Sequence, residues 1–415
     1  MNVRFMQRID VCAGVPMCWA LSTLNRVRRV FSSRAAAKRP PSRTLCIELS
    51  EIGSTVLAHS ALELLKRRSG GEVYFLTFRK NAGAIELLGV LPRENVITID
   101  DDSFGRFTTS AIAALRRIRK LKLDASIDLE LFSRFTMMFS YLTGAKARVG
   151  FSNYTNEGLY RGDLLTHPVF YNPHQHMALN LLALVAGLLE GDEHPNGRPL
   201  VKVDVREFLL TPPETPIPAK EKDEIARLLE RKVPAFGADS LMVLLSPDPG
   251  PALPLRGWAI SNFIRLTKDL LAHSPHVLVG ITGLKSSKPI AQEILDGLGP
   301  DERARVADFT GETSSMTALL ALFRESHLLI SNDGGSAHLA SLTGLPMIVL
   351  FGPETPALYA PLGPGVTSVF AGLSCSPCLS AANHRHSVCT NNLCLQAITP
   401  ESVLAEAVSK LFDRA

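Results

Sequence analysis

The sequence lacks any apolar run of the roughly 20 residues that a transmembrane helix needs. Its longest uncharged stretch near the start, from Val11 to Leu24, is interrupted by Gly14 and Pro16. No Gly-x-Gly-x-x-Gly follows an expected strand and no P-loop occurs, which removes the main support for a dinucleotide oxidoreductase or a nucleoside triphosphatase. Aromatic residues make up only 7%, whereas 46% of residues are hydrophobic and 20% charged, a composition typical of soluble globular proteins.

Cysteine is also scarce, with seven residues in 415, an odd number. Because no convincing export signal accompanies them, a reducing cytoplasm is the simpler expectation for the compartment. A chain of this length exceeds one ordinary hydrophobic core, so two domains of about 150–200 residues each are expected.

The net charge of +4 is unevenly distributed, because the basic excess lies in an N-terminal segment, residues 1–43, called the basic leader below. Residues 1–43 contain nine Lys or Arg and one acidic residue, Asp10, which leaves 35 basic and 39 acidic residues in the remainder. The body therefore lacks the charge of a nucleic-acid-binding protein, and no nucleic-acid partner is expected. The leader, with Trp19, Leu21 and Leu24 among its charges, suits the surface of the inner membrane. A disordered extension, a start codon placed too early and a targeting segment are the alternatives.

Beyond the leader, two series of apolar strands alternate with amphipathic helices. Strands are expected at 44–49, 73–78, 96–99, 125–129 and 148–151, and again at 241–245, 277–282, 306–309, 328–331 and 347–351. This pattern predicts an α/β protein with two doubly wound parallel sheets. Pro and Gly residues separate the series, so we expect domains at 44–186 and 240–415, with a linker and leading helix at 187–239. Thr399 and Pro400 signal the start of a last helix.

The most informative stretch follows the strand at 328–331 and reads Asp333-Gly334-Gly335-Ser336-Ala337-His338. Asp333 is expected to cap the next helix, and the small residues after it would leave the first helical amides uncovered. Such amides suit an anionic group, above all a diphosphate. An ordinary capped turn between strand and helix is the alternative.

This run, with Gly344-Leu345-Pro346 and Leu350-Phe351-Gly352-Pro353-Glu354-Thr355-Pro356 after it, resembles the nucleotide-sugar site of the bacterial heptosyltransferase family, glycosyltransferase family 9. The resemblance is strong over about 240–410, weaker over 44–185 and absent before 44. Members of this family are inverting glycosyltransferases of GT-B architecture that act in lipopolysaccharide core assembly. The resemblance implies two Rossmann-like domains facing a central cleft, with the acceptor on the N-terminal domain and the nucleotide sugar on the C-terminal one.

The resemblance also assigns donor-binding residues: Arg256, Gly311, Thr313, Asp333, Gly334, Gly335, Ser336, Ala337 and His338. Arg256 occupies the family's basic position before a Trp, and its guanidinium could hold two phosphate oxygens at once. A surface Arg is the alternative there. Thr313 or Ser314 could instead cap a helix, and His338 could pack between helix and sheet.

The proposed catalytic base of the family lies on the turn after the first strand. Many members carry Gly-Asp there, whereas this chain has Gly53-Ser54. Glu51, three residues before Ser54 on the same turn, is therefore the candidate general base. A solvated turn Glu is the alternative.

A segment over 151–178 is rich in residues suited to stacking on a sugar acceptor: Tyr154, Tyr160, His167, Tyr171, His174 and His176. A long crossover with exposed His residues is the alternative.

Four cysteines near the C-terminus, Cys375, Cys378, Cys389 and Cys394, have the spacing of a structural zinc site. Free thiols and disulfides are the alternatives, and no catalytic metal is implied.

The resemblance, together with these candidate residues, implies an inverting transfer of heptose from ADP-heptose to a hydroxyl of a lipopolysaccharide core or related glycan. The partners would be a nucleotide diphosphate sugar and a lipid-linked acceptor, met in the cytoplasm at the inner membrane. A GT-B nucleotide-sugar epimerase and a non-catalytic, membrane- or glycan-binding member of the family are the alternatives.

Overall fold

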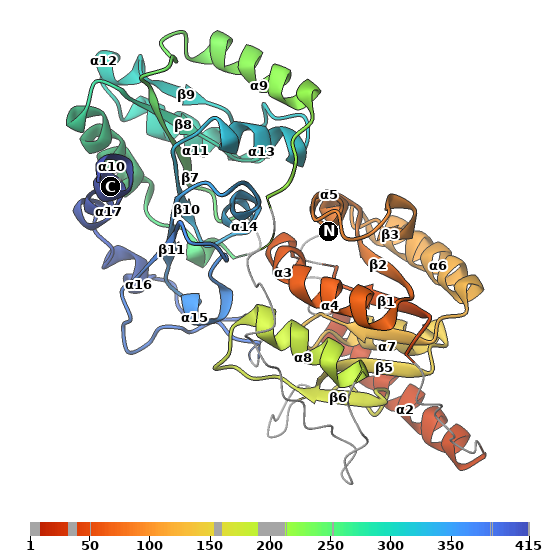
Figure 1. Cartoon of the computed structure of the whole chain (residues 1–415). Helices are drawn as coiled ribbons and strands as arrows, with labels where there is room; N and C mark the ends of the chain where they lie inside the picture. The colour runs from red at the N-terminus through yellow and green to blue at the C-terminus, as the bar shows by residue number, and fades with distance from the viewer. Residues whose placement is uncertain are drawn as a thin grey trace. The chain divides into compact units, whose positions relative to one another are not determined.

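The computed structural model describes residues 9–31, 40–49, 51–152, 160–189, 212, 214–250, 253–381, 383 and 385–413. The chain divides into two compact units, Met1–Leu210 and Thr211–Ala415. Each unit is built around one six-stranded parallel sheet (Figure 1). The division falls inside the stretch expected as a linker, while the exact domain boundaries stay a prediction.

The first sheet has the strand order β3-β2-β1-β4-β5-β6. Its strands are β1 Arg43–Ile47, β2 Glu72–Phe78, β3 Val96–Ile99, β4 Ala125–Asp128, β5 Ala147–Ser152 and β6 His167–Phe170, and every neighbouring pair is parallel. The order reverses between β1 and β4, whose register pairs Cys46 with Ile127. Open α/β sheets place ligands at the carboxyl ends of the strands that flank such a reversal.

Helices cover both faces of this sheet. They are α3 Ile52–Leu57, α4 His59–Ser69, α5 Ala82–Leu87, α6 Phe104–Leu121, α7 Arg134–Thr143 and α8 Met177–Leu189, with 3-10 turns η1 Arg79–Asn81 and η2 Arg93–Asn95. Helices α6 and α7 bring Ile118 and Phe139 into a core with Leu45 and Ile47 of β1. Helices α4 and α8 pack on each other, and α8 also contacts β5 and β6.

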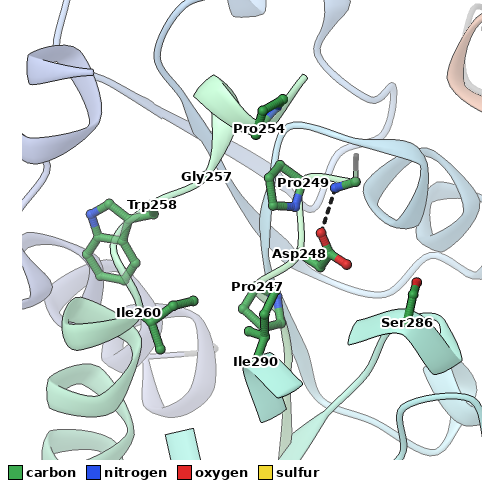
Figure 2. A pocket seen from close by; sticks show the side chains of 10 residues that line it. Pro247, Asp248, Pro249, Pro254, Gly257, Trp258, Ile260, Ser286 and Ile290 are labelled. Atoms are coloured by element: carbon green, nitrogen blue, oxygen red, sulfur yellow. Dashed lines mark hydrogen bonds between the residues drawn. The ribbon is translucent and has the colours of Figure 1, made fainter. Parts of the chain in front are cut away.

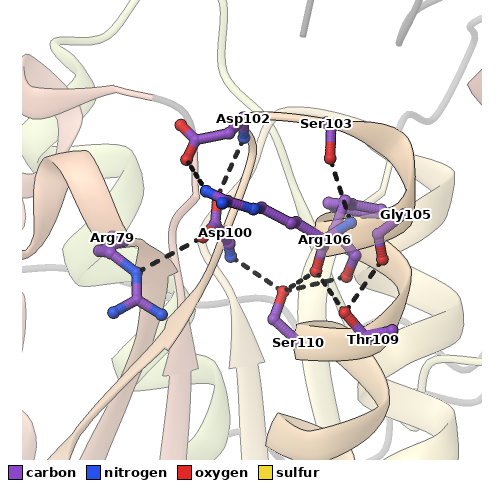
Figure 3. A network of polar contacts seen from close by, with 9 residues as sticks. Arg79, Asp100, Asp102, Ser103, Gly105, Arg106, Thr109 and Ser110 are labelled. Carbon is purple, nitrogen blue, oxygen red and sulfur yellow. Dashed lines mark hydrogen bonds and ion pairs between the residues drawn. The ribbon is translucent and has the colours of Figure 1, made fainter.

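Local polar contacts fix the start of α6 at the end of β3 (Figure 3). The Ser103 hydroxyl accepts a hydrogen bond from the Arg106 amide at 3.3 Å, so Ser103 is the N-cap. The Ser110 hydroxyl accepts from the Asp100 amide at 3.0 Å, and Arg79 Nε lies 3.8 Å from Asp100 Oδ2. The first contact is a helix cap, and the other two anchor Asp100 at the carboxyl end of β3.

The basic leader contains a helix, α2 Gly14–Phe31, that packs on α7. Asp10, just before α2, accepts from the backbone amides of Arg134 and Phe135 at 3.0 and 2.9 Å, and pairs with Arg134 Nη1 at 3.1 Å. The carboxylate thereby complements the N-terminal end of α7. This differs from the expectation of an extension separate from the domain, because the acidic residue of the leader is a partner of the folded unit.

The second sheet repeats this topology with the order β12-β11-β10-β7-β8-β9. Its strands are β7 Leu241–Ser246, β8 Val277–Ile281, β9 Val306–Asp308, β10 Leu328–Asn332, β11 Met347–Phe351 and β12 Val366–Phe370, all parallel to their neighbours. The order reverses between β7 and β10, so the carboxyl ends of these two strands are the expected ligand position.

The helices of the second unit are α9 Ala219–Lys232, α10 Ile260–His273, α11 Lys288–Asp296, α12 Pro300–Arg303, α13 Met316–Arg324, α14 Gly335–Ala340, α15 Pro356–Tyr359, α16 Leu393–Gln396 and α17 Pro400–Phe412. Three 3-10 turns join them: η4 Pro254–Arg256, η5 Lys285–Ser287 and η6 Ser341–Thr343. The start of α17 is confirmed, because the Thr399 hydroxyl accepts from the Ser402 amide and Pro400 is the first helical residue. Among the helices in the described ranges, none is both long enough and apolar enough to cross a membrane.

Candidate functional site

Two charged residues meet at the strand-order reversal of the second sheet. Arg256 follows β7 through η4, and Asp333 directly follows β10. Arg256 Nη1 lies 3.3 Å from Asp333 Oδ2, and the two side chains are only 17% and 6% exposed. Arg256 Nε is buried and makes no hydrogen bond to any described residue. Arg256 therefore brings a guanidinium group, with an Nε donor that no described residue uses, to the expected ligand position.

Two asparagine side chains hold the segment that carries Arg256. Asn332, the last residue of β10, accepts from the Trp258 amide at 3.0 Å and donates to the Pro247 carbonyl at 2.6 Å. Asn392 donates to the carbonyl oxygens of the residues on either side of Arg256, at 3.0 and 2.8 Å. Trp258 itself is 2% exposed in the hydrophobic core. The backbone around Arg256 is thus fixed from two directions.

A pocket of about 370 Å³ opens beside this segment (Figure 2). It is lined by Pro247, Asp248, Pro249, Gly250, Pro254, Gly257, Trp258, Ile260, Ser286 and Ile290. Asp248 shapes the loop, since it accepts from the Gly250 amide at 2.8 Å and from the Ser287 hydroxyl at 2.6 Å. The pocket lies where β7 ends and α10 and α11 begin, so it is at the edge of the sheet where a ligand is expected.

The turn after β10 differs from its expected capping pattern. The N-cap of α14 is Gly334 in an extended conformation, without a side-chain cap. The expectation that Asp333 caps this helix is wrong, because its carboxylate pairs with Arg256. The residues from Gly334 to Ser336 are partly exposed, while Ala337 and His338 are buried, the latter 5% exposed.

A third charged group, Glu354 after β11, was missed by the sequence analysis. Its side chain is 2% exposed, and neither carboxylate oxygen accepts a hydrogen bond from a described residue, although Arg385 Nε lies 3.4 Å from Oε1. Burial, reinforced by the charge of Asp333 and opposed by Arg256, raises the pKa of Glu354 to about 8. Burial likewise raises the pKa of Asp333, and Arg256 opposes that rise. An acidic residue soon after a buried strand was the available signal.

Gly311 and Thr313 lie after β9, at the edge of the sheet and two strands from β7. Gly311 has φ +68°, and a Cβ there would lie 2.8 Å from the Lys285 Cα, so the turn requires glycine. The expected capping by Thr313 or Ser314 is wrong, because the N-cap of α13 is Ser315, which accepts from the Ala318 amide at 3.1 Å.

In the first unit, Glu51 and Asp128 occupy the corresponding strand-order reversal. Glu51 precedes α3 and is partly exposed, and its Oε2 accepts from the Ser54 hydroxyl at 3.1 Å. Asp128, the last residue of β4, is buried and lies 3.3 Å from Arg161 Nη1. Burial, opposed by Arg161, raises the pKa of Asp128 to about 7. From the sequence, Asp128 was predicted only as part of the strand at 125–129.

Only part of the aromatic segment over 151–178 is exposed to solvent, where it could contact a ligand. Tyr171 is a core residue, edge to face with Phe132 and Phe151 at 5.8 and 5.4 Å between ring centroids. Tyr160 is 44% exposed, and Tyr154 lies outside the described residues.

The four cysteines near the C-terminus, Cys375, Cys378, Cys389 and Cys394, are described, but two residues of the loop between them, Ala382 and His384, are not. All seven cysteines are free. In the part of the chain that the structure describes, no three His, Cys, Asp or Glu side chains are placed to hold a metal ion. The zinc site at Cys375, Cys378, Cys389 and Cys394 therefore gains no support from this geometry.

Comparison with curated proteins finds similarity to heptosyltransferases. Lipopolysaccharide heptosyltransferase 2 of Salmonella typhimurium and that of Escherichia coli are each 27% identical over 128 residues, which is 31% of this chain. The matched segment spans only 36% of each relative.

Solved structures show the same fold. The structure of E. coli ADP-heptose lps heptosyltransferase II covers 89% of this chain and 99% of its own, with a TM-score of 0.66 and 17% identity. A glycosyl transferase family 9 structure from Veillonella parvula covers 92% and 100%, with a TM-score of 0.70 and 17% identity. These likenesses confirm the α/β, GT-B fold class. The model of glycosyltransferase family 9 (heptosyltransferase) matches residues 214–388, so this segment of the second unit is similar to that family.

Proposed function

We propose that the chain is an inverting glycosyltransferase that moves heptose from ADP-heptose to a hydroxyl of a lipopolysaccharide core or a related glycan. The observation that carries the proposal is the Arg256–Asp333 pair at the strand-order reversal of a unit similar to glycosyltransferase family 9. Cleavage of the donor leaves a nucleoside diphosphate, so the site needs fixed positive charge where negative charge accumulates.

Arg256 would supply that charge. Its Nε is free of protein partners among the described residues, and Asp333 together with the two asparagine contacts holds the guanidinium in place before the donor arrives. The amides from Gly334 to Ala337 would add hydrogen-bond donors to the departing phosphate. Gly311, Thr313 and His338 stay predicted contacts to the nucleotide or sugar. The proposal requires no catalytic metal, because the arginine and the amides take the role of a cation.

Glu51 would act as the general base that removes the proton of the acceptor hydroxyl. Two features support this role: its place at the carboxyl end of β1, and its hydrogen bond from Ser54, which limits the orientations of the carboxylate. The acceptor would be a lipid-linked glycan, met in the cytoplasm at the face of the inner membrane.

Thermal unfolding of the full chain with ADP, UDP or GDP tests the donor assignment. A ligand that binds only the folded state adds about 2.7 kcal/mol of stability at a hundredfold excess over its dissociation constant. We expect a shift with ADP that is lost in Arg256→Gln and kept in the matched control Arg303→Gln, whose side chain on α12 is 50% exposed. An ADP-heptose transfer assay follows. A shift with UDP or GDP alone would replace the donor, and no shift with any nucleotide would contradict the proposal.

A further inference from the structure

Helix α2 has one face inside the first unit and one face outside it. Gly14, Cys18, Ser22 and Asn25 are buried, at the three- and four-residue spacing of a single helix face. Cys18 is fully buried in a cluster with residues of α7. This inner face explains why the leader is folded. The opposite half of the helix, which Figure 1 shows at the periphery of the unit, is largely exposed.

The outward face is apolar. We define it by Met17, Trp19, Leu24 and Val27, which are 51%, 64%, 45% and 52% exposed. At about 100° per residue, all four point away from the buried face. Thr23 lies among them, but its hydroxyl donates to the Trp19 carbonyl at 3.0 Å, so its polar group is satisfied within the helix. Contiguous exposed apolar surface of this kind marks sites that bind another protein or a membrane.

Positive charge accompanies the outward face. Arg26 and Arg28 are exposed on the same helix. The side chain of Arg26 is 72% exposed, and its Nε makes a long, solvent-exposed ion pair with Asp163 Oδ2 at 3.7 Å, so a lipid phosphate could still contact the guanidinium. The single acidic residue of the leader, Asp10, is turned inward to Arg134 and the amides at the start of α7, with 19% of its side chain exposed. In the described part of α2, Arg26 and Arg28 are therefore exposed, whereas Asp10 lies against the folded unit.

We propose that α2 is a membrane-docking helix that lies in the headgroup layer of an anionic bilayer. Met17, Leu24 and Val27 would enter the boundary with the acyl chains, Trp19 would lie at the interface, and Arg26 and Arg28 would contact lipid phosphates. Two copies of this helix would bring like charges together, so an anionic lipid surface fits better than self-association. The inference rests on the proposed function only in that a lipid-linked acceptor gives surface attachment its use.

Flotation of the full chain with vesicles tests the inference. We expect binding to vesicles of phosphatidylglycerol and phosphatidylethanolamine, weakened by added salt, and little binding to phosphatidylcholine. The combined variant Met17→Gln, Leu24→Gln and Val27→Gln should bind about tenfold or more weakly, because each side chain loses its transfer into the apolar layer. Ile112→Gln on α6, a residue 46% exposed outside α2, is the matched control and should bind as the wild type does.

Two further measurements separate the outcomes. The combined variant should keep the wild-type melting temperature and ADP-induced shift, because the altered side chains are exposed and belong to the first unit. Equal vesicle binding by the wild type and the variant would overturn the inference. So would a concentration-dependent dimer that the variant abolishes, since the helix would then bind a second copy. Normal vesicle binding without any nucleotide shift would overturn the proposed function and leave the docking helix intact.

Discussion

Arg256 and Asp333 are 77 positions apart in the chain, yet their side chains meet at 3.3 Å where the order of the second sheet reverses. The topology causes this contact. Arg256 follows β7 and Asp333 follows β10, and β7 and β10 are neighbours in the sheet. The guanidinium of Arg256 is thereby positioned at the edge of the sheet where a ligand is expected. Its ion pair with buried Asp333 compensates the cost of placing a charge in a low-dielectric environment.

Replacing Arg256 should reduce transfer more than it reduces folding. Arg256→Lys keeps a charge but loses the planar fork, so we expect about a tenfold loss of kcat/KM, and Arg256→Gln should lose about a hundredfold or more. Arg256→Gln should also destabilise the fold by roughly 1–3 kcal/mol, because it leaves Asp333 buried without its ion pair. Asp333→Asn removes the negative charge that Arg256→Gln leaves unpaired. The double variant should therefore recover part of the lost free energy of unfolding, which urea unfolding measures. Additive losses in the two single variants and the double variant would contradict the pairing.

Glu354 should make stability fall as pH rises. The pKa of this carboxyl is raised from 4.5 to about 8 by burial, so the folded state keeps a proton that the unfolded chain has released. Its favourable contribution is complete below pH 4.5 and is lost as pH approaches 8. Glu354→Gln cannot ionise, so its stability relative to the wild type should rise across this interval by roughly 1–3 kcal/mol. Urea unfolding at several pH values measures the difference, with exposed Glu406→Gln on α17 as the control. A pH-independent difference would show that Glu354 is already ionised in the folded state.

Gly311→Ala should destabilise the second unit by roughly 1–3 kcal/mol. The residue has φ +68°, which side chains rarely adopt, and the new Cβ would collide with the backbone at Lys285. Gly237→Ala is the matched control, since no atom lies within 4 Å of a Cβ there and its φ lies outside the positive range. Thermal unfolding should lower the melting temperature of the first variant only. Similar melting temperatures for the two variants would mean that the turn after β9 adapts to a side chain.

Glu51→Gln should separate chemistry from donor binding. Loss of a general base lowers turnover by about a hundredfold to ten-thousandfold, while the ADP-induced thermal shift should be unchanged because Glu51 is in the first unit. The exposed Glu94→Gln should retain full turnover. If Glu51→Gln also retains it, the base is another residue, and Asp128 at the end of β4 is the next carboxylate to change.

The strands with continuous apolar runs could be predicted from the sequence, because burial on both faces leaves a strong local pattern. Strands β6 and β12 could not. The first is short and contains Pro168, and the second is only partly buried along its whole length. Both lie at sheet edges, where the apolar signal is weakest.

The sequence indicated individual candidate residues of the site, whose roles stay predictions, but it did not indicate their contacts. Arg256 and Asp333 were identified through local motifs, whereas their mutual ion pair depends on which strands are neighbours. The capping of α14 was mispredicted for the same reason, since a distant arginine competes for the Asp333 carboxylate. Glu354 was not predicted as a site residue. Its raised pKa results from burial, which the local sequence does not show.

The contact between Asp10 and Arg134 ties the basic leader to the folded part of the first unit. The Arg134 side chain is 2% exposed, and Asp10 is its carboxylate partner. A chain trimmed to begin at the first strand would lose this carboxylate and also the face of α2 that packs against Arg134 and Met137, so a buried part of α7 would become exposed to solvent. The trimmed product should be poorly soluble and prone to proteolysis, so the basic leader needs to stay attached even in experiments that concern only sugar transfer.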